Sequence, residues 1–192
     1  MSDRKLKQHA MTYTLDIARQ AAKDVTHFLH TFFVPPLWPR TVAVHNVEED
    51  RAYQAYDVDL LWTLLGKNGR LRTIPLEIKG DRYHKTGNFF FETMSNEGKG
   101  TTGCFLYTKA VWLFYYFVGN GRLYCLPVDR VRPWFWHQMD HFAERRTSTP
   151  VGDDQYVTVG RLVPITQLLA DLPGIYQFQK TAAGWALVRQ ET

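Results

Sequence analysis

Two segments of the chain carry four charged residues whose types and spacing could form a reactive or metal-binding site. Asp57 and Asp59 lie in one apolar run, and Glu77 follows Asp59 by 18 residues in a second apolar run that also holds Lys79. Side chains alternate along a strand, so Glu77 and Lys79 share one face. Charged groups on a half-buried strand are costly unless they are paired or bound to metal. The pattern predicts carboxylates that hold a hard cation beside an ammonium group.

The turn between the two runs decides whether these side chains meet. A loop with an odd number of residues, such as 67–69 with its glycine in the left-handed conformation, would place Asp59 opposite Glu77 and Asp57 opposite Lys79. A two-residue loop would turn Asp59 away from Glu77. A metal site therefore requires an odd-length loop at this point of the chain.

The elements that must position these residues can be read from the periodicity of apolar side chains. Helical spacing, strand-like alternation and turn residues suggest an α/β fold, with a mixed central sheet flanked by helices. We expect one domain over residues 1–192, with a core at about 15–146 and a C-terminal strand and helix extension at 147–192. The predicted helices are 15–32, part of 104–118, 129–146 and 165–172; the predicted strands are 41–47, 56–65, 71–79, part of 104–118, 122–128 and 156–163; a polar tail follows.

Composition sets outer limits on function. The 192 residues carry a formal net charge of +4, are 45% hydrophobic and are 15% aromatic, which is typical of a folded domain whose charge permits an anionic partner. We expect no membrane contact, because no apolar run approaches the ~20 residues of a spanning helix, and the charged N-terminus does not resemble a signal peptide. Cys104 and Cys125 lie in apolar, strand-like runs without the four clustered ligands of a zinc site. We expect two buried reduced thiols and a cytoplasmic location.

A strand-borne acid, a turn and then Glu-x-Lys on an apolar strand resemble the PD-(D/E)xK, or restriction-endonuclease-like, nuclease superfamily. The specific part of the resemblance is 54–92, where a Thr-Gly-Asn-x-x-x-Glu segment resembles phage and bacterial members. The helix at 15–33 occupies the place of that family's first core helix. Two features depart from the pattern: no proline precedes the acid, and the first helix offers only Asp16 and Asp24 where some branches carry a metal-binding glutamate.

The resemblance implies a Mg²⁺-dependent or Mn²⁺-dependent nuclease that hydrolyses phosphodiester bonds of DNA and leaves a 5′-phosphate. Asp59, Glu77 and Lys79 would be catalytic, and the metal ligands would be Asp59, Glu77 and the backbone carbonyl of Ile78. Lys79 would orient or deprotonate the attacking water, or neutralise the phosphate. The family pattern favours Asp59 over Asp57, which would then be a supporting partner or a solvated charge.

Further residues downstream have both a functional and a structural interpretation. Glu92 would support the site or be a surface acid, and Asn88 would contact phosphate or form a turn. Arg82, His84 and Lys85 would contact phosphate at the mouth of the site or lie in a solvated loop. A second Glu-x-Lys, at 97–99, lies in a glycine-rich loop that cannot fix a ligand, and we set it aside.

Other functions fit the same residues. The charged groups on the strands could form a cross-strand ion-pair ladder with no catalytic role. The chain could be a catalytically silent nuclease-fold module that binds nucleic acid or a protein partner, or a structural phage or host-interaction protein. The sequence does not distinguish DNA from RNA. A homodimer would serve cleavage of both strands, although no residue identifies a dimer surface.

Overall fold

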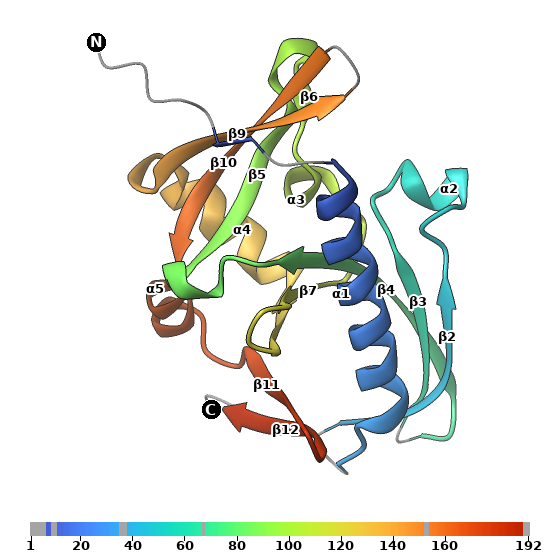
Figure 1. Ribbon diagram of the computed structural model, residues 1–192. Coiled ribbons are helices and arrows are strands. Elements are labelled where there is room, and N and C mark those ends of the chain that lie inside the picture. The colour runs from blue at the N-terminus through green and yellow to red at the C-terminus, as the bar shows by residue number, and fades with distance from the viewer. Residues whose placement is uncertain (1–6, 9–10, 35–37, 67, 152–153, 190–192) are drawn as a thin grey trace.

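The protein has an α/β fold with two sheets. The computed structural model describes residues 7–8, 11–34, 38–66, 68–151 and 154–189. The larger sheet has seven strands in the order β12-β11-β8-β7-β4-β3-β2, and the smaller has five in the order β1-β9-β10-β5-β6. β4 pairs antiparallel with β3 and parallel with β7, so the central sheet is mixed (Figure 1). The predicted class, α/β with a mixed central sheet flanked by helices, is confirmed.

The chain passes back and forth between the two sheets, and helices lie at several of the crossings. In chain order the elements are β1 (Lys7–Gln8), α1 (Met11–Thr31), β2 (Arg40–Asn46), α2 (Arg51–Gln54), β3 (Leu60–Leu65), β4 (Leu71–Asp81), η1 (His84–Thr86), β5 (Asn88–Asn96), η2 (Glu97–Lys99), β6 (Thr101–Thr102), α3 (Cys104–Tyr107), β7 (Trp112–Phe117), β8 (Arg122–Pro127), α4 (Val128–Gln138), η3 (Met139–His141), β9 (Ala143–Val151), β10 (Asp154–Pro164), α5 (Ile165–Asp171), β11 (Tyr176–Thr181) and β12 (Gly184–Arg189).

Helix α1 covers one face of the central sheet. Its apolar positions recur at helical spacing and pack on side chains of β3, β4, β7 and β8. The helix lies close to the sheet beside Gly80 on β4, where an added Cβ would stand only 2.8 Å from the Cβ of Ala21. Any larger residue at position 80 would push α1 away from the strand that carries Glu77 and Lys79. The glycine is therefore required by this close approach.

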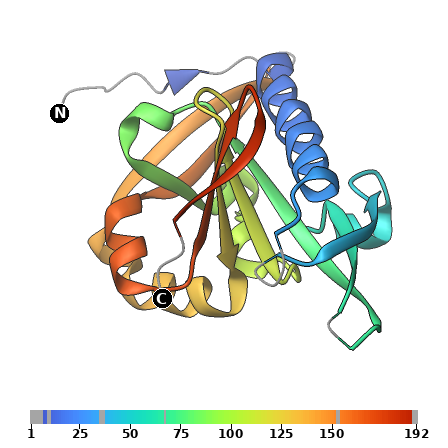
Figure 2. The same ribbon diagram turned by 90° about the horizontal axis from the view of Figure 1, so that it is seen from below.

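The other face of the central sheet packs against β5, α3, α4 and α5. Strand β7 contributes to both cores, because Phe114 and Tyr116 point toward α1 while Leu113, Tyr115 and Phe117 point the other way. Seen from below, α1 lies on one side of the central strands, and α4 and α5 lie on the other (Figure 2). The smaller sheet is thereby held against the face of β4 that presents Glu77 and Lys79.

Most of the predicted elements are present, and four predictions were wrong. The strand expected from residue 56 begins only at Leu60, and a turn precedes it. Residues 143–146 are not helical but open β9. Cys104 begins a short helix rather than lying in a strand. The expected polar tail is the hairpin β11–β12, whose first strand joins the central sheet beside β8. Segment 147–192 thus contributes strands to both sheets.

The described helices differ in length or in apolarity from a membrane span. Helix α1 is the longest, with 21 residues, and its sequence alternates apolar with polar and charged side chains. None of the described helices is both long and apolar enough to cross a bilayer.

Asp24 joins α1 to the sheet and should contribute to stability. Its buried carboxylate accepts hydrogen bonds from Tyr116 (2.9 Å) and from the ammonium of Lys180 on β11 (2.7 Å). Burial works to raise the pKa of Asp24, but the hydrogen bonds from Lys180 and Tyr116 outweigh burial and hold it below its ordinary value of 3.8. Asp24 thus anchors α1 and is not part of a metal site.

We predict that Asp24→Asn lowers the free energy of unfolding by about 1–2 kcal/mol at pH 7, because it loses a charged hydrogen-bond acceptor. A carboxyl whose pKa is lowered by folding stabilises the protein above its ordinary pKa, and this contribution is lost as the pH falls through the lowered value. The difference between the two proteins should therefore shrink below pH ~4. Urea titrations at several pH values measure it, with exposed Asp16→Asn as the control. A difference that does not shrink as the pH falls below ~4 would contradict the assignment.

Candidate active site

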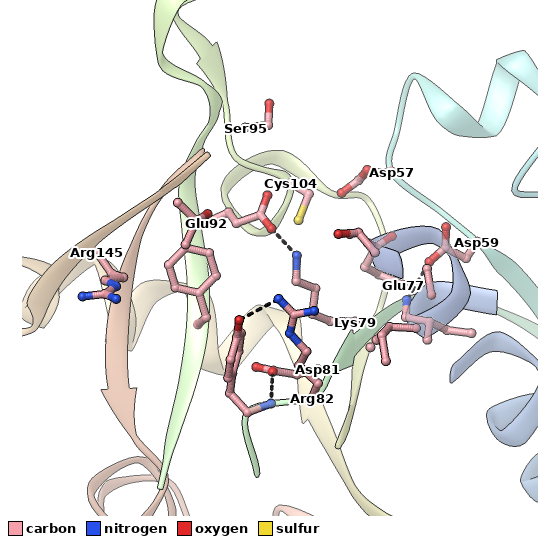
Figure 3. A pocket seen from close by; sticks show the side chains of 18 of the residues that line it. Asp57, Asp59, Glu77, Lys79, Asp81, Arg82, Glu92, Ser95, Cys104 and Arg145 are labelled. Atoms are coloured by element: carbon pink, nitrogen blue, oxygen red, sulfur yellow. Dashed lines mark hydrogen bonds and ion pairs between the residues drawn. The ribbon is translucent and has the colours of Figure 1, made fainter. Parts of the chain in front are cut away.

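A cavity of about 610 Å³ lies where α1, β4 and the smaller sheet meet. One side is formed by the N-terminal half of α1, the floor by the C-terminal half of β4, and the far side by β5 and β9. Lining side chains include both expected and unexpected residues: Asp57, Asp59, Glu77, Lys79, Arg82, Asn88, Glu92, Cys104 and Arg145. Figure 3 shows the side chains of Glu77, Lys79, Glu92 and Cys104 converging there.

The pairing of β3 with β4 brings the first of these groups together. The ladder runs from Leu60 opposite Leu76 to Leu65 opposite Leu71, and Gly69 in the turn is left-handed with φ 74°. The loop therefore has an odd number of residues, and this prediction is confirmed. Next to the ladder, the carboxylate of Asp59 accepts a hydrogen bond of 2.7 Å from the backbone N–H of Ile78. The same register places Asp59 beside Glu77.

Asp57 lines the cavity from a turn and not from the strand that was expected to carry it. It is not part of β3; among the described residues it is the one non-glycine residue with a positive φ, at 53°. Aspartate tolerates this left-handed conformation better than most residues. The turn is fixed from outside, because the carbonyl of Asp57 accepts a hydrogen bond from Thr108 Oγ1 (2.6 Å) and the carbonyl of Tyr56 accepts one from Lys109 N–H (2.9 Å). The prediction that strand alternation alone aligns Asp57 with Lys79 was therefore wrong.

Three acidic groups crowd one wall of the cavity. Glu77 is 7% exposed, and its Oε2 is buried without a hydrogen-bond partner, as is Oδ2 of Asp57. Burial first, and then the neighbouring carboxylates, raise the pKa of Glu77 well above its usual range and raise that of Asp59 to about 6. Burial also raises the pKa of Asp57. Buried like charges at this spacing call for a proton or a cation.

Lys79 is held by Glu92. The ammonium donates to Glu92 Oε1, and both side chains are largely buried. Burial acts to lower the pKa of Lys79, but the charge of Glu92 raises it above its ordinary value. Lys79 is therefore an ammonium ion in this structure. Glu92 reaches it because Phe89 and Phe91 on β5 point into the core, which turns the alternate positions toward the cavity.

The loop after β4 is fixed by Asp81, which sequence reasoning missed. The buried carboxylate of Asp81 accepts hydrogen bonds from the hydroxyl of Tyr115 and from the backbone N–H of Tyr83 (2.6 Å). Burial and Asp81 raise the pKa of Tyr115 well above its usual range, so the hydroxyl remains a donor. Tyr83 is positioned in turn to accept a hydrogen bond of 2.7 Å from the guanidinium of Arg82. Asp81 is therefore a structural support for Arg82.

The proposed phosphate contacts separate into two groups. Arg82 lines the cavity, whereas His84 and Lys85, which lie in η1, are absent from its lining. The ring of His84 packs against Gly119 instead. Asn88 borders the cavity, and its side-chain amide donates to the carbonyl of Thr86 (2.8 Å), as expected for a turn.

Two further residues of the cavity were not singled out as site residues. Cys104 is half-buried at the start of α3, and burial raises the pKa of its thiol well above the usual range. Arg145 stands on the opposite wall, on β9 (Figure 3). Arg145 and Thr147, both in the lining, alternate on one face of β9, but Arg145 lies in the segment 129–146 that was predicted to be helical. Nothing in the sequence marked Cys104 as different from a core cysteine.

Repulsion among the buried carboxyl groups should make the metal-free protein less stable than a variant that lacks one of them. We predict that Glu77→Gln raises its free energy of unfolding in EDTA at neutral pH by about 1–2 kcal/mol, as is usual when a strained functional group is removed. The exposed Glu49→Gln should change it by less than ~0.5 kcal/mol. Thermal and urea unfolding measure both values. A Glu77→Gln protein less stable than the wild type would show that the carboxylate stabilises the fold.

Comparison with known proteins does not assign this site to a family. No protein-family model, no curated protein and no solved structure matches the chain. The nuclease resemblance therefore remains a prediction that rests on the residues and geometry described above.

Proposed function

We propose that the protein is a divalent-metal-dependent nuclease with a restriction-endonuclease-like core, acting on DNA. The observation that carries the proposal is the meeting, in one cavity, of three acidic side chains and an ammonium group, with two buried carboxylate oxygens that have no hydrogen-bond partner. The position of α1 before the strands that carry the acidic residues, and the mixed central sheet, are consistent with what the resemblance implies.

The residues present fit a divalent cation. Oδ2 of Asp57 and Oε2 of Glu77 are buried and unpartnered, which is costly without a positive charge between them. We assign these two side chains, with the backbone carbonyl of Ile78, as the groups that would hold it. Asp59 becomes the supporting residue, because the N–H of Ile78 already engages its Oδ2. Bound Mg²⁺ or Mn²⁺ would stabilise charge on the scissile phosphate and make a bound water more acidic.

The cationic side chains of the cavity would bind the phosphate. We assign to Lys79, which is protonated in the metal-free protein, the role of neutralising a phosphate oxygen or orienting the water. Glu92 fixes the ammonium on the cavity wall by their ion pair. Arg82 and Arg145 approach the cavity from two other parts of the chain, the loop before η1 and β9, and both suit phosphate oxygens.

The first test is cleavage of supercoiled plasmid with Mg²⁺, with Mn²⁺ and with EDTA. The wild type should nick the plasmid with metal only, and Lys79→Ala should lower the rate by about 100-fold or more, the usual cost of a lost charge-stabilising group. Lys99→Ala is the matched control, since it alters the other Glu-x-Lys of the chain, outside the cavity. Undiminished cleavage by Lys79→Ala would refute the site.

A wild type that cuts plasmid with neither metal would next be titrated with branched and single-stranded DNA at low salt. Cleavage of one of these would keep the nuclease proposal and change its substrate. Binding without cleavage would replace it with the silent nucleic-acid-binding module.

The two aspartates give a separate prediction. Asp57→Asn should lower the cleavage rate by about 100-fold or more, as for Lys79→Ala. Asp59→Asn should cost less than ~10-fold, because an asparagine can still accept the hydrogen bond from Ile78. Single-turnover rates at saturating Mg²⁺ measure both. The reverse order would return the ligand assignment to Asp59.

A further inference from the structure

Cys104 lies beside the acidic groups and was expected only as a core thiol. Its Sγ, a carboxylate oxygen of Asp57 and one of Glu77 all lie within 4.8 Å of one another. In Figure 3 the sulfur lies on the Asp57 side of the Lys79 ammonium. Among the described residues, no other group of three such side chains has this geometry.

The chain holds Cys104 in place through its neighbours. Gly103 packs so closely under β5 that an added Cβ would lie 2.2 Å from the carbonyl oxygen of Glu92, and its N–H donates to the carbonyl of Thr93 (2.9 Å). The carbonyl of Cys104 accepts a hydrogen bond from Thr108 N–H (2.9 Å). Thr108 also holds the carbonyl of Asp57. The backbone that carries the thiol and the backbone that carries Asp57 are therefore fixed to each other.

A thiol that merely fills space does not account for the surrounding oxygens. One S–H has one proton to donate, yet Oδ2 of Asp57 and Oε2 of Glu77 both remain buried without a partner. Nor is the thiol half of a disulfide, because Cys104 and Cys125 are both free and Cys125 lies in the core on β8. A cation between the three groups would satisfy both oxygens.

We propose that Cys104 is a ligand of the metal, together with Asp57 and Glu77, and that the site accordingly prefers a thiolate-binding transition metal such as Co²⁺ or Zn²⁺ to Mg²⁺. This inference rests on the proposed metal-dependent function and changes the metal assigned to it. Sulfur is a soft ligand that Mg²⁺ avoids and that Zn²⁺ and Co²⁺ accept. When the metal–sulfur bond forms, the thiol proton passes to solvent.

The test is titration of the full chain with Co²⁺, whose bond to a thiolate gives a charge-transfer absorption band in the near ultraviolet. The wild type and Cys125→Ala should show the band, and Cys104→Ser should lack it. The Kd for Co²⁺, from calorimetry, should rise by about tenfold or more in Cys104→Ser, while the Kd for Mg²⁺ changes by less than ~2-fold. An equal band in Cys104→Ser would overturn the proposal.

A second readout needs no variant of Cys104. Co²⁺ should protect Cys104 of the wild type from alkylation by iodoacetamide, as mapped by peptide mass spectrometry, whereas Mg²⁺ should not. Glu77→Gln should lose the protection. If Co²⁺ binds in a Glu77-dependent manner with neither band nor protection, the carboxylates act without the thiol; this proposal then fails and the nuclease proposal stands. If no divalent metal binds the wild type, both fail.

Discussion

The pairing of β4 with β3 on one edge and with β7 on the other is the constraint on which the site depends. Because β4 is a central strand, its side chains alternate between the two faces of the sheet. Glu77 and Lys79 therefore lie on the face toward the smaller sheet. Gly80 lets α1 lie close on the opposite side. A shift of one residue in the β3–β4 register would exchange the two faces and bury the charges against α1.

Electrostatics and packing oppose each other in this cavity. Oδ2 of Asp57 and Oε2 of Glu77 are buried without a hydrogen-bond partner near the aromatic core that packs against β5, and low local polarity makes such oxygens costly. Lys79 offsets only part of this negative charge, because Glu92 already engages its ammonium. The site therefore stays attractive to cations although the chain as a whole carries a formal charge of +4. Local charge, rather than net charge, sets what this cavity would bind.

The sequence was informative where one local rule governed the structure. Alternation placed Glu77 and Lys79, and a left-handed glycine set the odd-length turn that brings Asp59 to Glu77. Sequence reasoning failed where contacts with distant segments determine the backbone conformation. Asp57 lies in a run that alternates like a strand, but hydrogen bonds from the segment after α3 hold it in a left-handed turn. The sequence around Cys104 is that of a core thiol, but the packing of α3 beneath β5 places this residue at the cavity.

The bonds that join Thr108 and Lys109 to the turn at Asp57 also limit how the chain could vary in length. Residues 97–102 form a short 3₁₀ turn and a two-residue strand at the rim of the smaller sheet, so insertions there would be absorbed at the surface. The segment from Gly103 to Lys109 cannot change length in this way, because Gly103 packs closely under β5 and Lys109 is hydrogen-bonded to the turn at Asp57. Removing a single residue of this seven-residue stretch other than Cys104 or Tyr107 would draw an acidic group out of the cavity without altering any residue that lines it.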